Sequence, residues 1–108
     1  MQTEKIKLTT SIQATASAER YRFFCFTGAP TAEGERAMGV AVNACLPGDW
    51  VAVAVQGEML VESGGAVNAG DLVQSDDQAR AIVLGVGLEC GVARDSAESA
   101  GDLIRVIR

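Results

Sequence analysis

Short apolar segments separated by turn-forming residues are the main pattern along the chain. Residues 50–55 are the clearest of these segments, because large and small apolar side chains alternate in them as on the two faces of a strand. Four further segments are predicted to be strands, namely residues 20–26, 37–42, 80–84 and 103–107. Clusters of glycine, proline and aspartate lie between the strands, and the one segment with helical character is residues 95–100. The sequence therefore predicts an all-β domain.

A glycine–aspartate pair followed by two apolar residues is repeated along the chain. The three copies begin with Gly48 and Asp49, Gly70 and Asp71, and Gly101 and Asp102. Glycine can adopt the positive φ that a tight turn needs, and aspartate can accept hydrogen bonds from nearby backbone amides. Each copy is therefore predicted to be a tight turn that leads into a strand, which is a structural role and specifies no activity.

The composition excludes most enzyme chemistry and argues against binding to nucleic acid. The chain has 108 residues, which is the size of one domain, and it contains no histidine. Catalytic triads, histidine-ligated metals and imidazole bases are therefore absent. The net charge is −5, with one tryptophan, one tyrosine and three phenylalanines, whereas nucleic-acid binders need a basic surface and stacking rings. We expect a protein that is not an enzyme and has no cofactor.

The chain shows no membrane span, export signal or disulfide framework. Its longest uncharged stretch, residues 37–48, is too short to cross a bilayer, and the N-terminal segment is too polar for a signal peptide. The three cysteines, Cys25, Cys45 and Cys90, are widely spaced and odd in number. We expect them to be small buried side chains in a reducing cytoplasm, with an exposed thiol as the alternative.

Two sequence features suggest active-site chemistry but fit other roles better. Gly85, Gly87 and Gly91 follow an apolar run, but their spacing is one residue too long for a dinucleotide-binding fingerprint. They are predicted to be flexible or bulged strand connections. Asp76 and Asp77 are adjacent carboxylates, with too few oxygen ligands nearby for a calcium loop. We expect them at the solvated tip of a hairpin.

The aromatic residues raise the question of a covered outer surface. Trp50 begins the most regular strand, so we expect it in the core, with an interface anchor as the alternative. In an extended strand Phe24 and Phe26 share one face, and Phe23 points to the other. Large apolar groups on both faces fit a barrel whose outer side is covered, for example by a second subunit.

The order of these segments resembles a known family. An N-terminal part with FCFTGAP is followed by GVAVNACLPGDWVAVAVQGEMLVESGGAVNAGDLVQSD and, at the C-terminus, by GVARDSAESAGDLIRVIR. This pattern resembles the small capsid cement, or decoration, proteins of tailed bacteriophages. The resemblance covers residues 39–108, whereas residues 1–38 match only in general character. Cys45 and Pro47 depart from the pattern, where small residues would be usual.

The resemblance implies both a fold and a function. It implies a single small β-barrel of the β-tulip type that forms a homotrimer and sits on the outside of an icosahedral head. Such trimers bind the major capsid protein at threefold and quasi-threefold positions and stabilise the shell by bridging its subunits. The family does not catalyse a reaction. The protein would then be made in the host bacterial cytoplasm and end on the outer surface of the virion.

Two segments are expected to organise these contacts. Residues 1–19 are predicted to form an extended arm, and residues 20–108 the barrel domain. Alternation in the arm places Ile6 and Leu8 on one face and Lys5 and Lys7 on the other, so residues 1–10 are expected to pair with a neighbouring chain or with the capsid. These four residues and Trp50 are the candidate trimer or capsid contacts.

Two other functions remain open: an accessory subunit of an enzyme, and a small-ligand-binding barrel.

Overall fold

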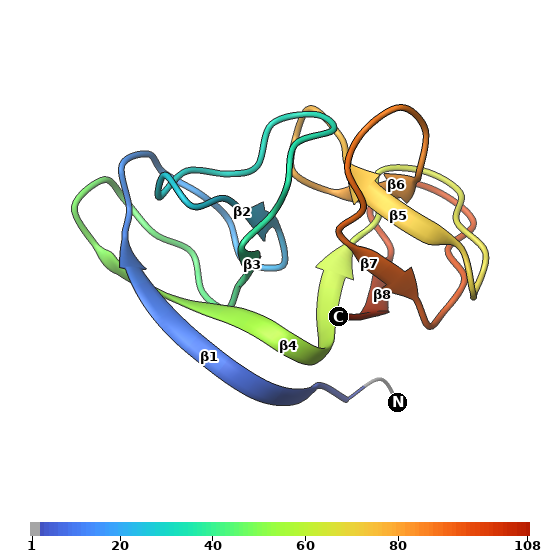
Figure 1. The fold of residues 1–108 in the computed structure, drawn as a ribbon, viewed down its shortest axis with the longest axis horizontal. Helices are drawn as coiled ribbons and strands as arrows, with labels where there is room; N and C mark the ends of the chain where they lie inside the picture. Colours follow the sequence, from blue (N-terminus) through green and yellow to red (C-terminus); the bar gives the residue numbers. More distant parts are fainter. Residues whose placement is uncertain (1–2) are drawn as a thin grey trace.

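The computed structural model describes residues 3–108, which form an all-β fold, as predicted (Figure 1). Its strands are β1 (Lys5–Gln13), β2 (Phe23–Phe24), β3 (Gly39–Ala41), β4 (Trp50–Glu62), β5 (Leu72–Ser75), β6 (Ala81–Val83), β7 (Gly91–Ala93) and β8 (Leu103–Ile107). No helix is present in this part of the chain, so the helical segment expected at residues 95–100 is wrong. There Ala97 and Val67 exchange two backbone hydrogen bonds, of 2.8 and 3.0 Å, which hold the segment against another loop instead.

All strand pairs are antiparallel, and the long strand β4 connects two groups of strands. The pairing order is β2-β3-β4-β8-β7-β5-β6, with β1 paired to β4 outside this path. β1 follows one edge of β4, while β3 and β8 pair with the first and last parts of its other edge (Figure 1). A backbone hydrogen bond of 2.8 Å from Phe23 to Ala79 links β2 to the turn between β5 and β6, which brings together the two ends of the pairing order.

The observed strands match the predicted ones in position more closely than in length. The strand predicted at residues 103–107 is confirmed in full as β8. The strand predicted at residues 50–55 continues to Glu62, because β1 and β8 supply pairing partners beyond the regular alternation. β2, β3 and β6 are shorter than predicted, since the chain enters turns on both sides of each.

The core consists of two clusters on either side of β2 and β3. Phe23 belongs to the larger cluster, with Met59 and Ile104, and Phe24 belongs to the smaller one, with Val53. Phe26 is 63% exposed, because the chain turns back after β2 and closes hydrogen bonds between Cys25, Gly28 and Ala29. The expectation that Phe24 and Phe26 share a face is therefore wrong. Both buried phenylalanines are covered within one chain, so they do not require a second subunit.

The three Gly-Asp turns have the same geometry, as predicted. Gly48, Gly70 and Gly101 have φ values of 92°, 92° and 97°. In each turn the aspartate carboxylate accepts a hydrogen bond from a preceding backbone N–H, that of Leu46 (2.8 Å), Asn68 (3.0 Å) or Glu98 (3.3 Å). The N–H of each glycine donates to the carbonyl of a residue in another segment, and the N–H of that same residue donates to the carbonyl of the aspartate. The residue is Ala14 in the first turn, Ala93 in the second and Ser63 in the third. Each turn is thus locked to the end of another strand.

Removing one of these carboxylates is expected to have a moderate effect. Asp71→Ala leaves the Asn68 N–H without its 3.0 Å acceptor, and loss of such a cap costs about 1 kcal/mol of unfolding free energy. Asp102→Ala is expected to cost less, because its bond to Glu98 is longer, at 3.3 Å. Urea unfolding of the two variants tests this. An Asp71→Ala protein as stable as the wild type would contradict the role given to the carboxylate.

Candidate interaction surfaces

Residues 3–108 contain no group of three or more His, Cys, Asp or Glu side chains placed to hold a metal ion. No segment in this part of the chain folds into a helix with the length and hydrophobicity of a membrane span. The three cysteines are buried, as predicted. Cys25 Sγ lies 2.7 Å from Thr27 Oγ1, and the thiols of Cys45 and Cys90 lie near backbone carbonyls.

The N-terminal arm is a strand of the sheet. β1 pairs with β4 of its own chain from Lys5 to Gln13, while the pairing of this segment with a neighbouring chain or with the capsid stays a prediction; Met1 and Gln2 of the expected arm lie outside the described residues. The pairing register shifts between Ile6 and Leu8, where Lys7 forms a bulge. A shift of one residue reverses the side-chain direction. Ile6 packs on the core, whereas Leu8 is 50% exposed, so the two do not share a face as expected.

Trp50 lies on the surface, contrary to the expectation of a core position. It is 69% exposed at the start of β4, and the exposed Leu46 precedes it in the same turn. In all three Gly-Asp units the residue after aspartate is exposed and the next one is fully buried; the pairs are Trp50 and Val51, Leu72 and Val73, and Leu103 and Ile104. Comparing the three units in the sequence was the signal that could have placed Trp50 outside.

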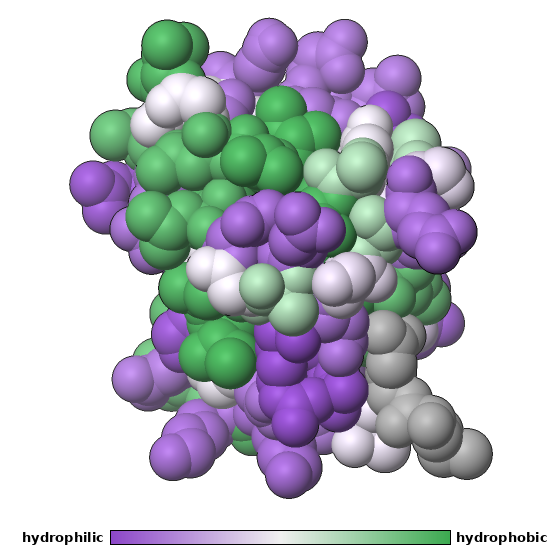
Figure 2. Space-filling view, turned by 90° about the vertical axis from the view of Figure 1, so that its right-hand side faces the viewer, coloured by the Kyte–Doolittle hydropathy of each residue, from purple (hydrophilic) through white to green (hydrophobic). Residues whose placement is uncertain are grey.

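A second apolar surface lies on the side of the molecule that carries β5 to β8. Figure 2 shows hydrophobic side chains gathered over part of this face. Leu72, Val83, Val86 and Leu88 are among the exposed large apolar side chains of the chain. Residues 84–88 connect β6 toward β7 and consist only of leucine, valine and glycine. Sequence reasoning interpreted the glycines here as flexible or bulged connections and missed the apolar surface.

Beside this loop, Gln74 fixes the backbone. Its side chain is buried, and Oε1 accepts hydrogen bonds from the N–H groups of Gly85 (2.8 Å) and Gly87 (3.0 Å). Leu88 N–H donates to Gly34 O at 2.8 Å, and a Cβ at Gly87 would overlap with the Cα of Gly34. Partly buried hydrogen bonds therefore hold the loop in place, and the expectation of flexible or bulged connections stays a prediction.

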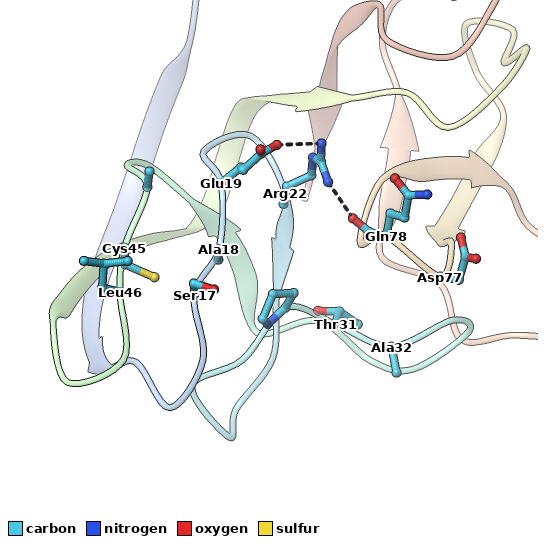
Figure 3. Close-up of a pocket in the computed structure, with 12 residues that line it drawn as sticks. Ser17, Ala18, Glu19, Arg22, Thr31, Ala32, Cys45, Leu46, Asp77 and Gln78 are labelled. Carbon is cyan, nitrogen blue, oxygen red and sulfur yellow. Dashed lines mark hydrogen bonds and ion pairs between the residues drawn. The ribbon is translucent and has the colours of Figure 1, made fainter.

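A cleft of about 790 Å³ has a mixed polar and apolar lining that comes from residues 17–22, 30–32, 44–46 and 77–78 (Figure 3). Arg22 spans it: its Nη2 donates to Glu19 at 2.9 Å, and its Nη1 donates to the carbonyl of Gln78 at 3.0 Å. The same Nη2 reaches Glu62 on β4 at 3.2 Å. Because these partners already satisfy the terminal nitrogens, the guanidinium holds together three segments of the chain.

Asp76 and Asp77 have different environments. Asp77 is exposed at the hairpin tip, as predicted, but Asp76 is 7% exposed and forms an ion pair with Arg80 at 3.1 Å. Asp76 is buried because its carboxylate accepts the backbone N–H groups of Gln78 and Arg80 inside the turn. The expectation of a solvated carboxylate pair is therefore wrong for Asp76.

Two arginines near the C-terminus have opposite pKa shifts. Hydrogen bonds to Asp95 raise the pKa of Arg105, and the nearby charges of Asp95 and Glu58 add to this against the effect of burial. Burial lowers the pKa of Arg108, whose Nη2 donates to the carbonyl of Ala37 at 3.0 Å. Arginine remains charged at neutral pH in either case. Arg108 therefore contributes a fixed positive charge beside β1 and β8.

The match to a family model shows which family the chain belongs to. The model for phage cement proteins matches residues 1–108. The chain belongs to the phage cement protein family. The resemblance found in residues 39–108 is thereby confirmed, and the match extends to residues 1–38, which resembled the family only in general character.

A solved structure shares the fold of this cement-family chain. The chain is similar to the "head fiber gp8.5 N base in bacteriophage phi29", with a TM-score of 0.76 and 19% sequence identity. The alignment covers 93% of this chain and 92% of the other. Among curated proteins, no sequence matches the chain. The family and the fold together identify a protein associated with the phage capsid.

Proposed function

We propose that the protein decorates the outer surface of a phage head as a homotrimer and stabilises the shell by bridging neighbouring major capsid proteins. The observation that carries this proposal is membership of the phage cement family over residues 1–108. The shared fold with the base of a head fiber protein supports it. On this proposal the chain is a β-tulip barrel without catalytic activity, made in the host cytoplasm and carried on the virion.

The size and surface of the chain suit this role. A stable interface takes about 800 Å² from each partner. The accessible surface is 5467 Å², which leaves room for contacts with neighbouring copies and with the shell. Three linked copies would also bind far more tightly than one, because the second and third contacts form within an attached molecule.

Trp50 is the residue we assign to the shell contact. It is exposed at one end of the long strand β4, with Leu46 exposed beside it in the turn. A large aromatic side chain can fill a pocket on a partner at little cost in conformational entropy, and tryptophan is enriched among the residues that dominate binding. The lysines of β1, Lys5 and Lys7, are also exposed.

Cosedimentation of the purified protein with mature and immature shells tests the proposal. We expect saturable binding to the mature shell, near one trimer for each threefold position. Trp50→Ala is expected to weaken binding about 30-fold, the effect of losing a contact worth about 2 kcal/mol. Leu103→Ala is the matched control, because Leu103 follows an equivalent Gly-Asp turn and is exposed. Absence of binding to both shells would overturn the proposed function.

A further inference from the structure

The two halves of the chain repeat one pattern of strand pairing. We call residues 9–54 the first half and residues 58–107 the second half; β4 runs through both (Figure 1). β1 pairs with the first part of β4 in the same register in which the last part of β4 pairs with β8. The five equivalent pairs begin with Thr9 and Ala54 in the first half and Glu58 and Ile107 in the second, and end with Gln13 and Trp50, and Glu62 and Leu103. The pairing of β2 with β3, and of β3 with β4, likewise corresponds to that of β5 with β7, and of β7 with β8.

The connections between these strands repeat as well. Each half has one isolated bridge between its loops, and in each half a backbone hydrogen bond of 2.8 Å joins the residue before the third strand to the second strand. The bridges join Ala18 to Cys45 and Val67 to Ala97, and the hydrogen bonds join Met38 to Phe24 and Cys90 to Val73. The chain therefore contains two copies of one unit, and equivalent residues can be compared one by one.

One sheet face of the first half is buried against the second half. This face carries Phe23 on β2, Val40 on β3 and Ala54 on β4, which lie opposite one another across the strands. All three are at most 2% exposed, and they belong to the same core cluster as Met59 and Val61 of the second half. Within one chain, the core of the second unit is thus closed by a face of the first unit.

The same face of the second half is only partly covered by residues 3–108. Its equivalent row consists of Leu72, Val92 and Ile107, which again lie opposite one another across the strands. We call these three residues the open row. Leu72 and Ile107 are each 43% exposed, and Val92 is partly exposed. The charged neighbour of Ile107 on β4, Glu58, is already paired with Arg94 at 2.7 Å. An apolar row that is buried in one unit and exposed in the other marks a surface for a partner.

The first half shows the complementary deficit at its own core. Three core residues of the second half, each at most 1% exposed, have first-half equivalents that are not buried; the pairs are Met59 and Thr10, Val61 and Ile12, and Cys90 and Met38. Thr10 is exposed, whereas Ile12 and Met38 lie partly buried at the margin of the smaller core cluster. We call Thr10, Ile12 and Met38 the receiving surface. The first unit therefore lacks the cover that the second unit obtains from it.

We propose that the open row of one copy of this chain packs on the receiving surface of the next copy. The proposal rests on the homotrimer of the proposed function and names the surfaces that form it. The occupant is a second copy because the chain already makes this contact once, between the same two surfaces of its own repeated unit. A contact of this kind joins two different surfaces of identical chains, so it propagates head to tail and closes into a ring when the rotation permits.

Sedimentation velocity of the full-length protein tests the contact. We expect the wild type to be a trimer, and Leu72→Asp and Thr10→Asp each to be monomeric, with association weakened about 100-fold by a charge buried in the contact. Leu72 belongs to the open row and Thr10 to the receiving surface, so the two variants damage the two sides of one contact. Both residues are exposed within a single chain, so both variants are expected to fold. Unchanged circular dichroism and thermal unfolding check this.

The repeated unit provides the matched controls. Leu46 is an exposed apolar residue, and its second-half equivalent, Glu98, stays exposed although that half is covered. Thr9 adjoins Thr10 but points to the opposite face of β1, and its equivalent in the second half, Glu58, is already a carboxylate. Leu46→Asp and Thr9→Asp are therefore expected to remain trimers.

Mixing the two defective variants gives a second, independent readout. The Leu72→Asp chain keeps an intact receiving surface, and the Thr10→Asp chain keeps an intact open row, so one contact can form between one chain of each kind. We expect an equimolar mixture to form a heterodimer, although each variant alone is monomeric. A mixture that stays monomeric would contradict the assigned pairing, because a contact between two different surfaces is restored in this way.

Shell binding by the same proteins separates this inference from the proposed function. A Leu72→Asp protein that remains trimeric but no longer binds shells would show that the open row contacts the capsid, and would overturn the inference. A wild type that is not a trimer, a Thr10→Asp protein that remains one, or a control variant that loses the trimer would also overturn it. If Leu72→Asp and Thr10→Asp abolish the trimer while the wild type binds no shell, the inference stands and the proposed function fails.

Discussion

Gly57→Ala is expected to lower the free energy of unfolding by about 3 kcal/mol and to loosen β1. Gly57 lies in β4 with φ +121°, a conformation that a residue with a side chain adopts only with strain. A Cβ there would overlap with the carbonyl oxygen of Lys5 and crowd the backbone of Lys7. These are backbone atoms of the paired strand, so they can move only if the β1–β4 pairing opens.

Two other glycines separate the contributions of strain and crowding. Gly70→Ala keeps the strain, at φ +92°, but meets no atom within 4 Å, and is expected to cost about 1 kcal/mol. Gly65→Ala has neither a positive φ nor an atom within 4 Å of the added Cβ, so it is expected to leave the free energy of unfolding unchanged. Urea unfolding measures all three, and amide hydrogen exchange reports on β1. A Gly57→Ala protein with wild-type stability and protected β1 amides would refute the explanation.

Asp76→Ala is expected to destabilise the fold by a similar amount, about 3 kcal/mol. The carboxylate accepts three hydrogen bonds, from the N–H groups of Gln78 (2.9 Å) and Arg80 (2.8 Å) and from Arg80 Nε (3.1 Å). Its removal leaves two backbone donors without that acceptor and deprives a mostly buried guanidinium of its nearest anion. Arg80 also lies 3.8 Å from Glu62, which contacts Arg22, so the effect reaches the end of β4.

The adjacent carboxylate provides the control. Asp77 has the same chemistry and is exposed at the tip of the turn. Asp77→Ala is expected to change stability by less than about 0.5 kcal/mol. Thermal and urea unfolding of the two single variants measure this difference in stability. Equal effects of the two substitutions would show that burial and pairing of Asp76 do not matter.

The part of the fold that could be predicted is the part that depends on local chemistry. A glycine that supplies positive φ and an aspartate that binds a nearby N–H form the same turn wherever they occur, so all three Gly-Asp turns were predicted correctly. The strand that follows each turn was predicted as well. Strand lengths depended on distant partners, so β4 was underestimated and β2 overestimated.

The candidate contacts were harder to predict, because exposure depends on position in the sheet. The bulge at Lys7 turns Leu8 outward, although the alternation in the sequence places it beside Ile6. Trp50 is exposed because it is the first residue after a locked turn, although it begins the most apolar strand. Hydrophobicity alone describes a side chain and does not say what lies opposite it.

By itself the sequence determined the all-β class, the Gly-Asp turns, the lack of histidine chemistry and the family resemblance, since each follows from residue identity and short-range spacing. Only the tertiary structure decided that the arm pairs with β4, that Asp76 is buried and Asp77 is not, and that residues 84–88 form an exposed apolar loop. These outcomes depend on contacts between residues far apart in the chain. Gln74, for example, binds the N–H groups of Gly85 and Gly87, which follow it by 11 and 13 residues.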